Sequence, residues 1–180
     1  AGLGGGSADG AFMIRLLDER FRLNIGIAEM ERYAAQLGSD CPFFITAEPS
    51  FATGRGELLE PADGPKGNLD GYYIAVVKPD EAVSTAMAYK QIKCRKPAKC
   101  CRDVVRQPID TWKDDLSNDF EEPVFKAHPR LASIKQQLYD LGAVYAQMSG
   151  SGSALFGIFR KEPTNIDEIF SDCFTFTSVL

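Results

Sequence analysis

The chain has 180 residues, of which 44% are hydrophobic and 25% are charged, a composition typical of a soluble globular protein with one domain and part of a second. Its formal net charge of −5 argues against a protein that coats nucleic acid, and no apolar run approaches the roughly 18 residues of a membrane-spanning helix. A single histidine and five irregularly spaced cysteines argue against a histidine-dependent triad, a zinc site and a disulfide framework, so we expect reduced thiols in a cytoplasmic protein.

The chain opens with a glycine-rich segment, residues 2–6, that leads directly into a helical pattern. Apolar residues recur at helical spacing from Ala8 to Phe21, and Ser7 is the predicted N-cap. Free N–H groups at a helix start attract anions, and glycine allows close approach to the backbone. The Walker A pattern does not fit, because no lysine follows Ser7. The dinucleotide-binding pattern does not fit either, because Ser7 occupies the position of its third glycine. The segment therefore predicts a phosphate loop of another type, with a flexible linker as the alternative.

Three further elements are predicted before residue 70. A second helix is expected over residues 27–37, with Gly38 at its C-terminal end. Residues 38–45 predict a tight polar turn that enters an apolar strand. A hairpin is expected from strands at 50–53 and 57–59 around Gly54-Arg55-Gly56, followed by a loop from Pro61 to Asn68.

The remaining residues predict an α+β arrangement. Residues 72–77 form the most apolar strand pattern of the chain and are expected to be buried on both faces. Asn118 and Glu121 resemble a capping box with Asn118 as the cap. Helices are expected at 83–92, 130–141 and 165–170, and strands at 144–148, 154–159 and 174–179. This order of strands and helices is typical of a split βαβ fold.

Three segments then stand out: the glycine loop with Ser7, the turn of residues 38–44 with Asp40, and the loop of residues 149–153. Residues 2–9 and 148–156 resemble the two glycine motifs of the GHMP kinase superfamily. Segments 38–44, 51–57, 84–89 and 117–119 are similar to the branch of that superfamily that phosphorylates the 2-hydroxyl of a cytidine diphosphate-linked methylerythritol in non-mevalonate isoprenoid biosynthesis.

The resemblance implies a GHMP kinase fold in two parts. Residues 1–68 would be the remainder of an ATP-binding N-terminal domain, and residues 69–180 a ferredoxin-like C-terminal domain. The family's first strand and a lysine that assists phosphoryl transfer have no counterpart in this sequence. We therefore expect this chain to be inactive by itself.

The resemblance also implies a set of site residues, with ATP and Mg²⁺ as cofactors. Asp40 would be the catalytic base, the Ser7 hydroxyl would help to hold Mg²⁺, and the Tyr89 ring would stack on the cytosine. ATP would be bound by Gly2, Leu3, Gly4, Gly5, Gly6, Ser7 and Ala8, and the substrate by Tyr89, Gly150, Ser151 and Gly152. The expected partners are small molecules only, and the oligomeric state stays open.

Alternatives remain for the whole chain and for single residues. The chain would otherwise be a homoserine- or mevalonate-type kinase of the same superfamily, a nucleotide-binding fragment without catalysis, or a nucleic-acid module centred on the basic run of residues 90–106. Asp40 would otherwise be a turn residue that bonds its own backbone, and Tyr89 a core aromatic. Residues 150–152 would otherwise be a simple glycine turn.

Overall fold

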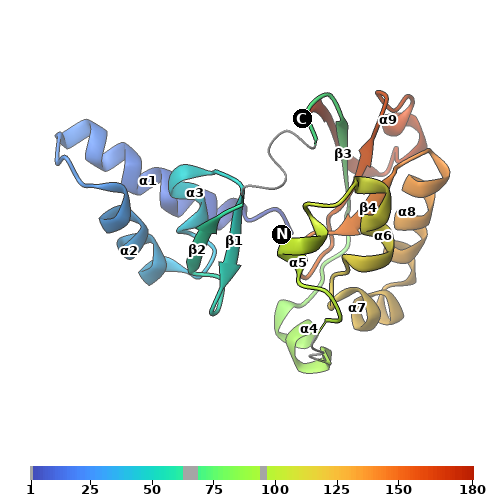
Figure 1. Ribbon diagram of the computed structural model, residues 1–180, viewed down its shortest axis with the longest axis horizontal. Coiled ribbons are helices and arrows are strands. Elements are labelled where there is room, and N and C mark those ends of the chain that lie inside the picture. The colour runs from blue at the N-terminus through green and yellow to red at the C-terminus, as the bar shows by residue number, and fades with distance from the viewer. Residues whose placement is uncertain (1, 63–68, 94–96) are drawn as a thin grey trace. The chain divides into compact units, whose positions relative to one another are not determined.

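The computed structural model of the protein describes residues 2–62, 69–93 and 97–180. Their contacts divide the chain into two compact units, residues 4–66 and residues 1–3 with 67–180. Figure 1 shows the two units and their elements, and each is described by itself. The assignment of residues 1–68 to an ATP-binding domain stays a prediction, because the units are defined by contacts and not by ligands.

The smaller unit, residues 4–66, packs helices around a small core. Its elements are α1 (Gly5–Phe21), α2 (Ile27–Leu37), α3 (Phe43–Thr46), β1 (Ser50–Thr53) and β2 (Leu58–Pro61). The core consists of Ala11, Ala34, Cys41 and Ile45, which come from α1, α2, the turn after α2, and α3. β1 and β2 pair as an antiparallel hairpin, as the sequence predicts.

Two expectations for this unit are wrong. The N-cap of α1 is Gly4, in the left-handed conformation at φ 66°, and Ser7 lies within the first helical turn. Glycine adopts this conformation without steric cost, so the helix begins after Gly4 without a serine side chain as its cap. Residues 43–46 form helix α3 instead of a strand. A short apolar run has no periodicity that distinguishes a strand from a buried helical turn.

The apolar pattern of α1 also overstates its burial. Ala11 is the buried residue of this helix, whereas Phe12, Leu16, Leu17 and Phe21 are exposed. In the described unit, the packed side of α1 faces the other members of the small core. The apolar stripe is therefore wider than the surface that α2 and α3 cover.

The larger unit is built on a four-stranded antiparallel sheet in the order β4-β5-β3-β6. Its strands are β3 (Tyr73–Pro79), β4 (Tyr145–Met148), β5 (Leu155–Phe159) and β6 (Cys173–Val179). The helices are α4 (Thr85–Gln91), α5 (Cys101–Val104), a 3₁₀ turn (Ile109–Thr111), α6 (Trp112–Asp115), α7 (Glu121–Ala127), α8 (Pro129–Asp140) and α9 (Ile166–Ile169). This is the predicted split βαβ arrangement of an α+β protein.

Two hydrophobic clusters contain alternate residues of β4 and β5 and therefore lie on opposite faces of this sheet. On one face, α8 contacts β4 and β5, and its Leu131 and Leu138 share a cluster with Leu155 of β5. On the other face, the indole of Trp112 lies edge-on to Tyr145, with ring centroids 5.6 Å apart. This second layer covers β4 and β5, so the outward-facing side chains of β3 are only partly buried and the predicted burial of that strand on both faces is wrong.

Candidate functional site

Gly2 and Gly4, the glycines of the opening segment with positive φ, are both required by packing to lack a side chain. Gly2, at φ +85°, lies against the second glycine loop: a Cβ atom on it would be 3.0 Å from the Gly152 carbonyl oxygen. A Cβ atom on Gly4 would be 2.8 Å from Cζ of Phe44. Both positions therefore exclude a side chain by contact with the protein itself.

Gly5 and Gly6 have no such reason. Both lie in the first turn of α1, and a Cβ atom on either would meet no described atom within 4 Å apart from the neighbouring backbone of the helix itself. Glycine in a helix costs about 0.5–1 kcal/mol relative to alanine. The first intrahelical bond runs from Ala8 N–H to the Gly4 carbonyl at 2.9 Å, so the N–H groups of the preceding turn are left for another acceptor.

Asp40 lies in the turn between α2 and α3, in the same unit as these glycines. Its side chain is exposed, and Oδ1 would be 3.5 Å from a Cβ atom on Gly56 in the hairpin turn. Within the described residues the carboxylate has no hydrogen-bond or ion-pair partner, so it does not bond its own backbone as the turn alternative requires. The next residue, Cys41, is buried, with its sulfur 3.9 Å from a Cβ position on Gly10 of α1. The core thus anchors the turn against α1 while the carboxylate stays accessible.

Tyr89 projects from α4 in the larger unit and is 63% exposed, which is not the core position of the alternative. Its ring meets Phe120 edge-on, with centroids 4.9 Å apart and planes at 82°. Ser84 caps α4 by accepting a hydrogen bond from Met87 N–H. A T-shaped contact engages one side of the Tyr89 ring, so at least one face of the exposed ring is available for stacking.

The second glycine loop joins β4 to β5 and is tightly held. Ser149 N–H donates to the Ala154 carbonyl at 2.8 Å, and Gly152 N–H donates to the Ser149 carbonyl at 2.9 Å. The Ser151 hydroxyl lies 2.9 Å from that of Thr85, the first residue of α4. The loop therefore contacts the helix that carries Tyr89, and both belong to one unit.

Asn118 is not the helix cap that the sequence predicts. α7 begins at Glu121 with Phe120 at its N-cap, and Asn118 instead bonds the second glycine loop from the preceding turn. The sequence marks Asn118 by its position three residues before Glu121 and by the resemblance of segment 117–119 to the GHMP kinases. The sequence carries no signal for its actual partners, because they lie about 30 residues further along the chain.

The structure divides the predicted residues between the two units. Gly4–Ala8 and Asp40 lie in the smaller unit, whereas Gly2, Leu3, Tyr89 and residues 150–152 lie in the larger one. Among the described residues no group of three His, Cys, Asp or Glu side chains is arranged to hold a metal ion. No helix in that part of the chain is long and apolar enough to cross a membrane.

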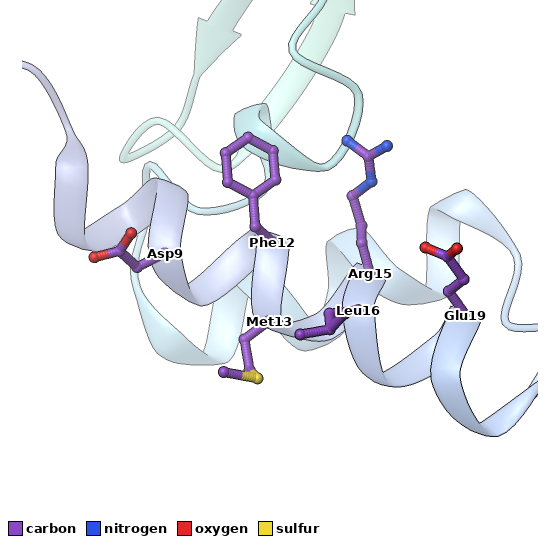
Figure 2. Close-up of a pocket in the computed structure, with 6 residues that line it drawn as sticks. All are labelled: Asp9, Phe12, Met13, Arg15, Leu16 and Glu19. Carbon is purple, nitrogen blue, oxygen red and sulfur yellow. The ribbon is translucent and has the colours of Figure 1, made fainter.

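Two other surface features stand apart from the predicted residues. Figure 2 shows a hollow along α1 lined by Asp9, Phe12, Met13, Arg15, Leu16 and Glu19, which does not include the glycines of the first turn. In the basic run, Lys99 pairs with Asp115 at 2.6 Å, while residues 94–96 lie outside the described part. The run thus carries at least one ion pair with an acidic neighbour.

Comparisons with known proteins agree on one family. Residues 102–173 match the model of the GHMP kinases C-terminal domain. The 4-diphosphocytidyl-2-C-methyl-D-erythritol kinases of Parabacteroides distasonis and Bacteroides fragilis are 49% and 46% identical over 97% and 100% of this chain. Residues 102–173 thus carry a GHMP kinases C-terminal domain, and the chain is similar to these kinases over nearly all of its length. It spans 64% and 65% of the lengths of these two relatives.

Solved structures place the GHMP kinase fold on the whole chain. A crystal structure of 4-(cytidine 5'-diphospho)-2C-methyl-D-erythritol kinase superposes with a TM-score of 0.81 at 26% identity, covering 98% of this chain and 65% of that one. The homoserine kinase of Cytophaga hutchinsonii superposes with a TM-score of 0.65 at 11% identity over 99% of this chain and 65% of its own. The second match shows the fold alone. The GHMP kinase resemblance and the α+β fold predicted from the sequence are thus confirmed.

Proposed function

We propose that this GHMP kinase chain contributes the ATP loop, the catalytic base and part of the substrate site of an enzyme that phosphorylates the 2-hydroxyl of 4-diphosphocytidyl-2-C-methyl-D-erythritol. Relatives at 46–49% identity carry that name and match nearly the whole chain. The proposed setting is isoprenoid precursor synthesis in the cytoplasm. The proposed partners are ATP and the cytidyl substrate.

The observation that carries the nucleotide site is the pair Gly5 and Gly6. Each weakens the helix, yet neither is required by packing among the described residues. A phosphate close to the backbone accounts for both, because its oxygens would occupy the space of a Cβ atom and accept from the free N–H groups. The positive end of the α1 dipole would add to the attraction.

Asp40 supplies the base in this proposal. As the hydroxyl oxygen forms its bond to the γ-phosphorus, the bond from phosphorus to the bridging oxygen breaks and ADP leaves. The hydroxyl proton passes to the Asp40 carboxylate, which is exposed and has no protein partner among the described residues. Its fixed turn, with Cys41 in the core, would limit its movement.

Mg²⁺ neutralises charge on the triphosphate in such transfers. The described residues offer no complete protein cage for it, which suits an ion that is usually bound by one or two side chains together with phosphate oxygens. Ser7, in the first turn of α1 and half-buried, is the residue proposed to hold it. Its hydroxyl is not engaged in a cap, so it is available for this role.

The substrate would be bound by the larger unit. Tyr89 offers an exposed ring face for the cytosine, and stacking of this kind contributes about 1–3 kcal/mol. The loop of residues 150–152 offers N–H groups to a substrate phosphate. A homoserine kinase function is the weaker proposal, because that neighbour shares 11% identity and supports the fold only.

An assay of the complete gene product with Mg-ATP tests the proposal. We expect ADP release with 4-diphosphocytidyl-2-C-methyl-D-erythritol and none above background with homoserine or mevalonate. Turnover of either alternative substrate in place of the cytidyl compound would overturn the proposed specificity. The inactivity of the 180-residue chain by itself stays a prediction, tested in the same assay.

A further inference from the structure

Both N–H groups and the oxygen of the Asn118 side chain form hydrogen bonds with backbone groups. Its Nδ2 donates to the carbonyl of Met148 at 2.8 Å and to that of Gly150 at 2.7 Å. Its Oδ1 accepts from Phe120 N–H at 2.9 Å. Because the NH₂ group donates two hydrogen bonds and the oxygen accepts one, the orientation of the carboxamide is fixed.

Met148 is held on both sides of its backbone. Its carbonyl receives the Asn118 bond, and its N–H donates to Oε1 of Glu121 at 2.9 Å. Glu121 is itself fixed, because its Oε2 accepts from Lys135 Nζ at 2.6 Å in a mostly buried ion pair. The Met148 side chain is 1% exposed and lies in the main core. The start of the second glycine loop is therefore attached to rigid structure.

The bond to Gly150 has a directional consequence. In a trans peptide the carbonyl and the following N–H point in opposite directions. Because the Gly150 carbonyl points at Asn118, the N–H of Ser151 points away from it. Among the described residues, that N–H donates to no backbone carbonyl. Gly150 is exposed at φ +54°, so this part of the loop borders solvent.

We propose that Asn118 is a positioning residue that aims the Ser151 N–H at a phosphate of the substrate. This role rests on the proposed function, in which residues 150–152 bind the cytidyl substrate. Asn118 does not touch the substrate; it acts through the Gly150–Ser151 peptide. The Thr85 hydroxyl, 2.9 Å from the Ser151 hydroxyl, also limits the movement of Ser151.

Two substitutions separate lost positioning from added charge. Asn118→Ala removes both donors, and Asn118→Asp keeps the shape and the acceptor but replaces the donors with a charge. Asp119→Asn is the matched control, because Asp119 is exposed and has no hydrogen-bond or ion-pair partner in the described part of the chain. The complete gene product and these three variants are assayed with Mg-ATP and 4-diphosphocytidyl-2-C-methyl-D-erythritol.

We expect both Asn118 variants to raise KM for the cytidyl substrate about 10- to 100-fold, the effect of losing one charge-assisted hydrogen bond. kcat and KM for ATP should stay within about 3-fold, since Asn118 touches neither reacting atom. Asp119→Asn should match the wild type. An unchanged KM in Asn118→Ala, including the case where Asn118→Asp alone raises it, would overturn the role of Asn118. A wild type that does not phosphorylate the substrate would overturn the proposed function instead.

A measurement on the wild type removes any dependence on how the variants fold. Cytidine diphosphate is added to the isotope-labelled protein, and the amide shifts of residues 150–152 are followed by NMR. We expect the Ser151 amide proton to shift more than that of Gly152, whose N–H is already bonded to the Ser149 carbonyl. A shift at Gly152 with none at Ser151 would contradict the proposal.

Discussion

The backbone of Gly2 lies against the backbone of Gly152, so that the chain leading to the first glycine loop rests on the second one. A Cβ atom on Gly2 would be 3.0 Å from the Gly152 carbonyl oxygen, and Gly2 has φ +85°. The two glycine motifs, 150 residues apart, thus meet at their edges within the larger unit. The contact holds the backbone of Gly2 within the larger unit.

Gly2→Ala should release this support. The substitution combines a left-handed backbone with contact to two backbone atoms of the second loop, which cannot move as a flexible side chain would. We expect faster amide exchange at Leu3 and a loss of about 1–2 kcal/mol of unfolding free energy at most, since the segment can detach. Gly71→Ala is the control, because Gly71 has φ +79° and an open Cβ position. Equal exchange at Leu3 in both variants would contradict the contact.

Asp40→Asn should remove turnover and leave nucleotide affinity intact. The amide keeps the shape of an exposed side chain that has no described partner, but it does not accept the hydroxyl proton at neutral pH. A fall of about 10²–10⁴-fold in kcat is expected, with the Kd for ATP within 2-fold in calorimetry. A variant that retains more than a tenth of wild-type kcat would remove Asp40 from the mechanism.

Tyr89→Ala should weaken binding of the cytidyl substrate, whereas Tyr89→Phe should not. The ring is exposed and makes a T-shaped contact with Phe120, and its face, not its hydroxyl, is proposed to contact the cytosine. Loss of stacking should raise KM by about 10- to 100-fold. Equal KM values for the alanine and phenylalanine variants would show that the ring does not stack on the substrate.

Tyr145 should make the larger unit less stable in alkali. Burial, with a smaller contribution from the charge of Glu121, raises the pKa of this phenol well above its usual value. The neutral form is therefore favoured in the folded state, and its stabilisation is present below pH 10 and lost as the pH rises further. The loss should approach about 1.4 kcal/mol per pH unit for this one group.

Urea unfolding between pH 8 and pH 11 measures this effect. Tyr145→Phe should lose about 1 kcal/mol at pH 8, because the hydrogen bond from the phenol to the Leu116 carbonyl at 3.3 Å is removed. It should then lose less stability than the wild type between pH 10 and pH 11. Parallel curves for the two proteins would show that Tyr145 does not titrate differently on unfolding.

The sheet and hairpin were predictable because local patterns dictate them. The segments of β3 and β5 are apolar runs bounded by turn residues. Gly54 and Gly56 supply the positive φ of the hairpin turn. The start of α1 was predictable only to within a turn. A serine is the better cap in isolation, but contact between Gly4 and Phe44 selects a left-handed glycine there.

The tertiary partners of the candidate site were not predictable. The residue types marked Asp40 and the glycine loops, yet Asn118 bonds carbonyls about 30 residues away, a pairing that exists only once α7 and β4 pack together. The exposed apolar side of α1 is a similar case. Periodicity reports which residues share a face, and the fold decides whether anything covers it.

The central claim is that the first turn of α1 binds the ATP phosphates, and nucleotide affinity in two alanine variants of one helix tests it most directly. Gly6→Ala places a Cβ atom where no described atom outside the neighbouring backbone of α1 lies within 4 Å. Gly10→Ala, in the second turn of α1, places one against the side chain of Leu37 of α2. Calorimetry of the complete gene product with Mg-ATP and with adenosine gives the Kd values. We expect Gly6→Ala to bind Mg-ATP at least about 10-fold more weakly than the wild type, a loss of about 1.4 kcal/mol in binding free energy. Gly10→Ala should bind Mg-ATP like the wild type. Adenosine should bind equally to all three proteins, because the loss is specific to the phosphates. Equal Mg-ATP affinity in the three proteins would contradict a phosphate site at this helix start.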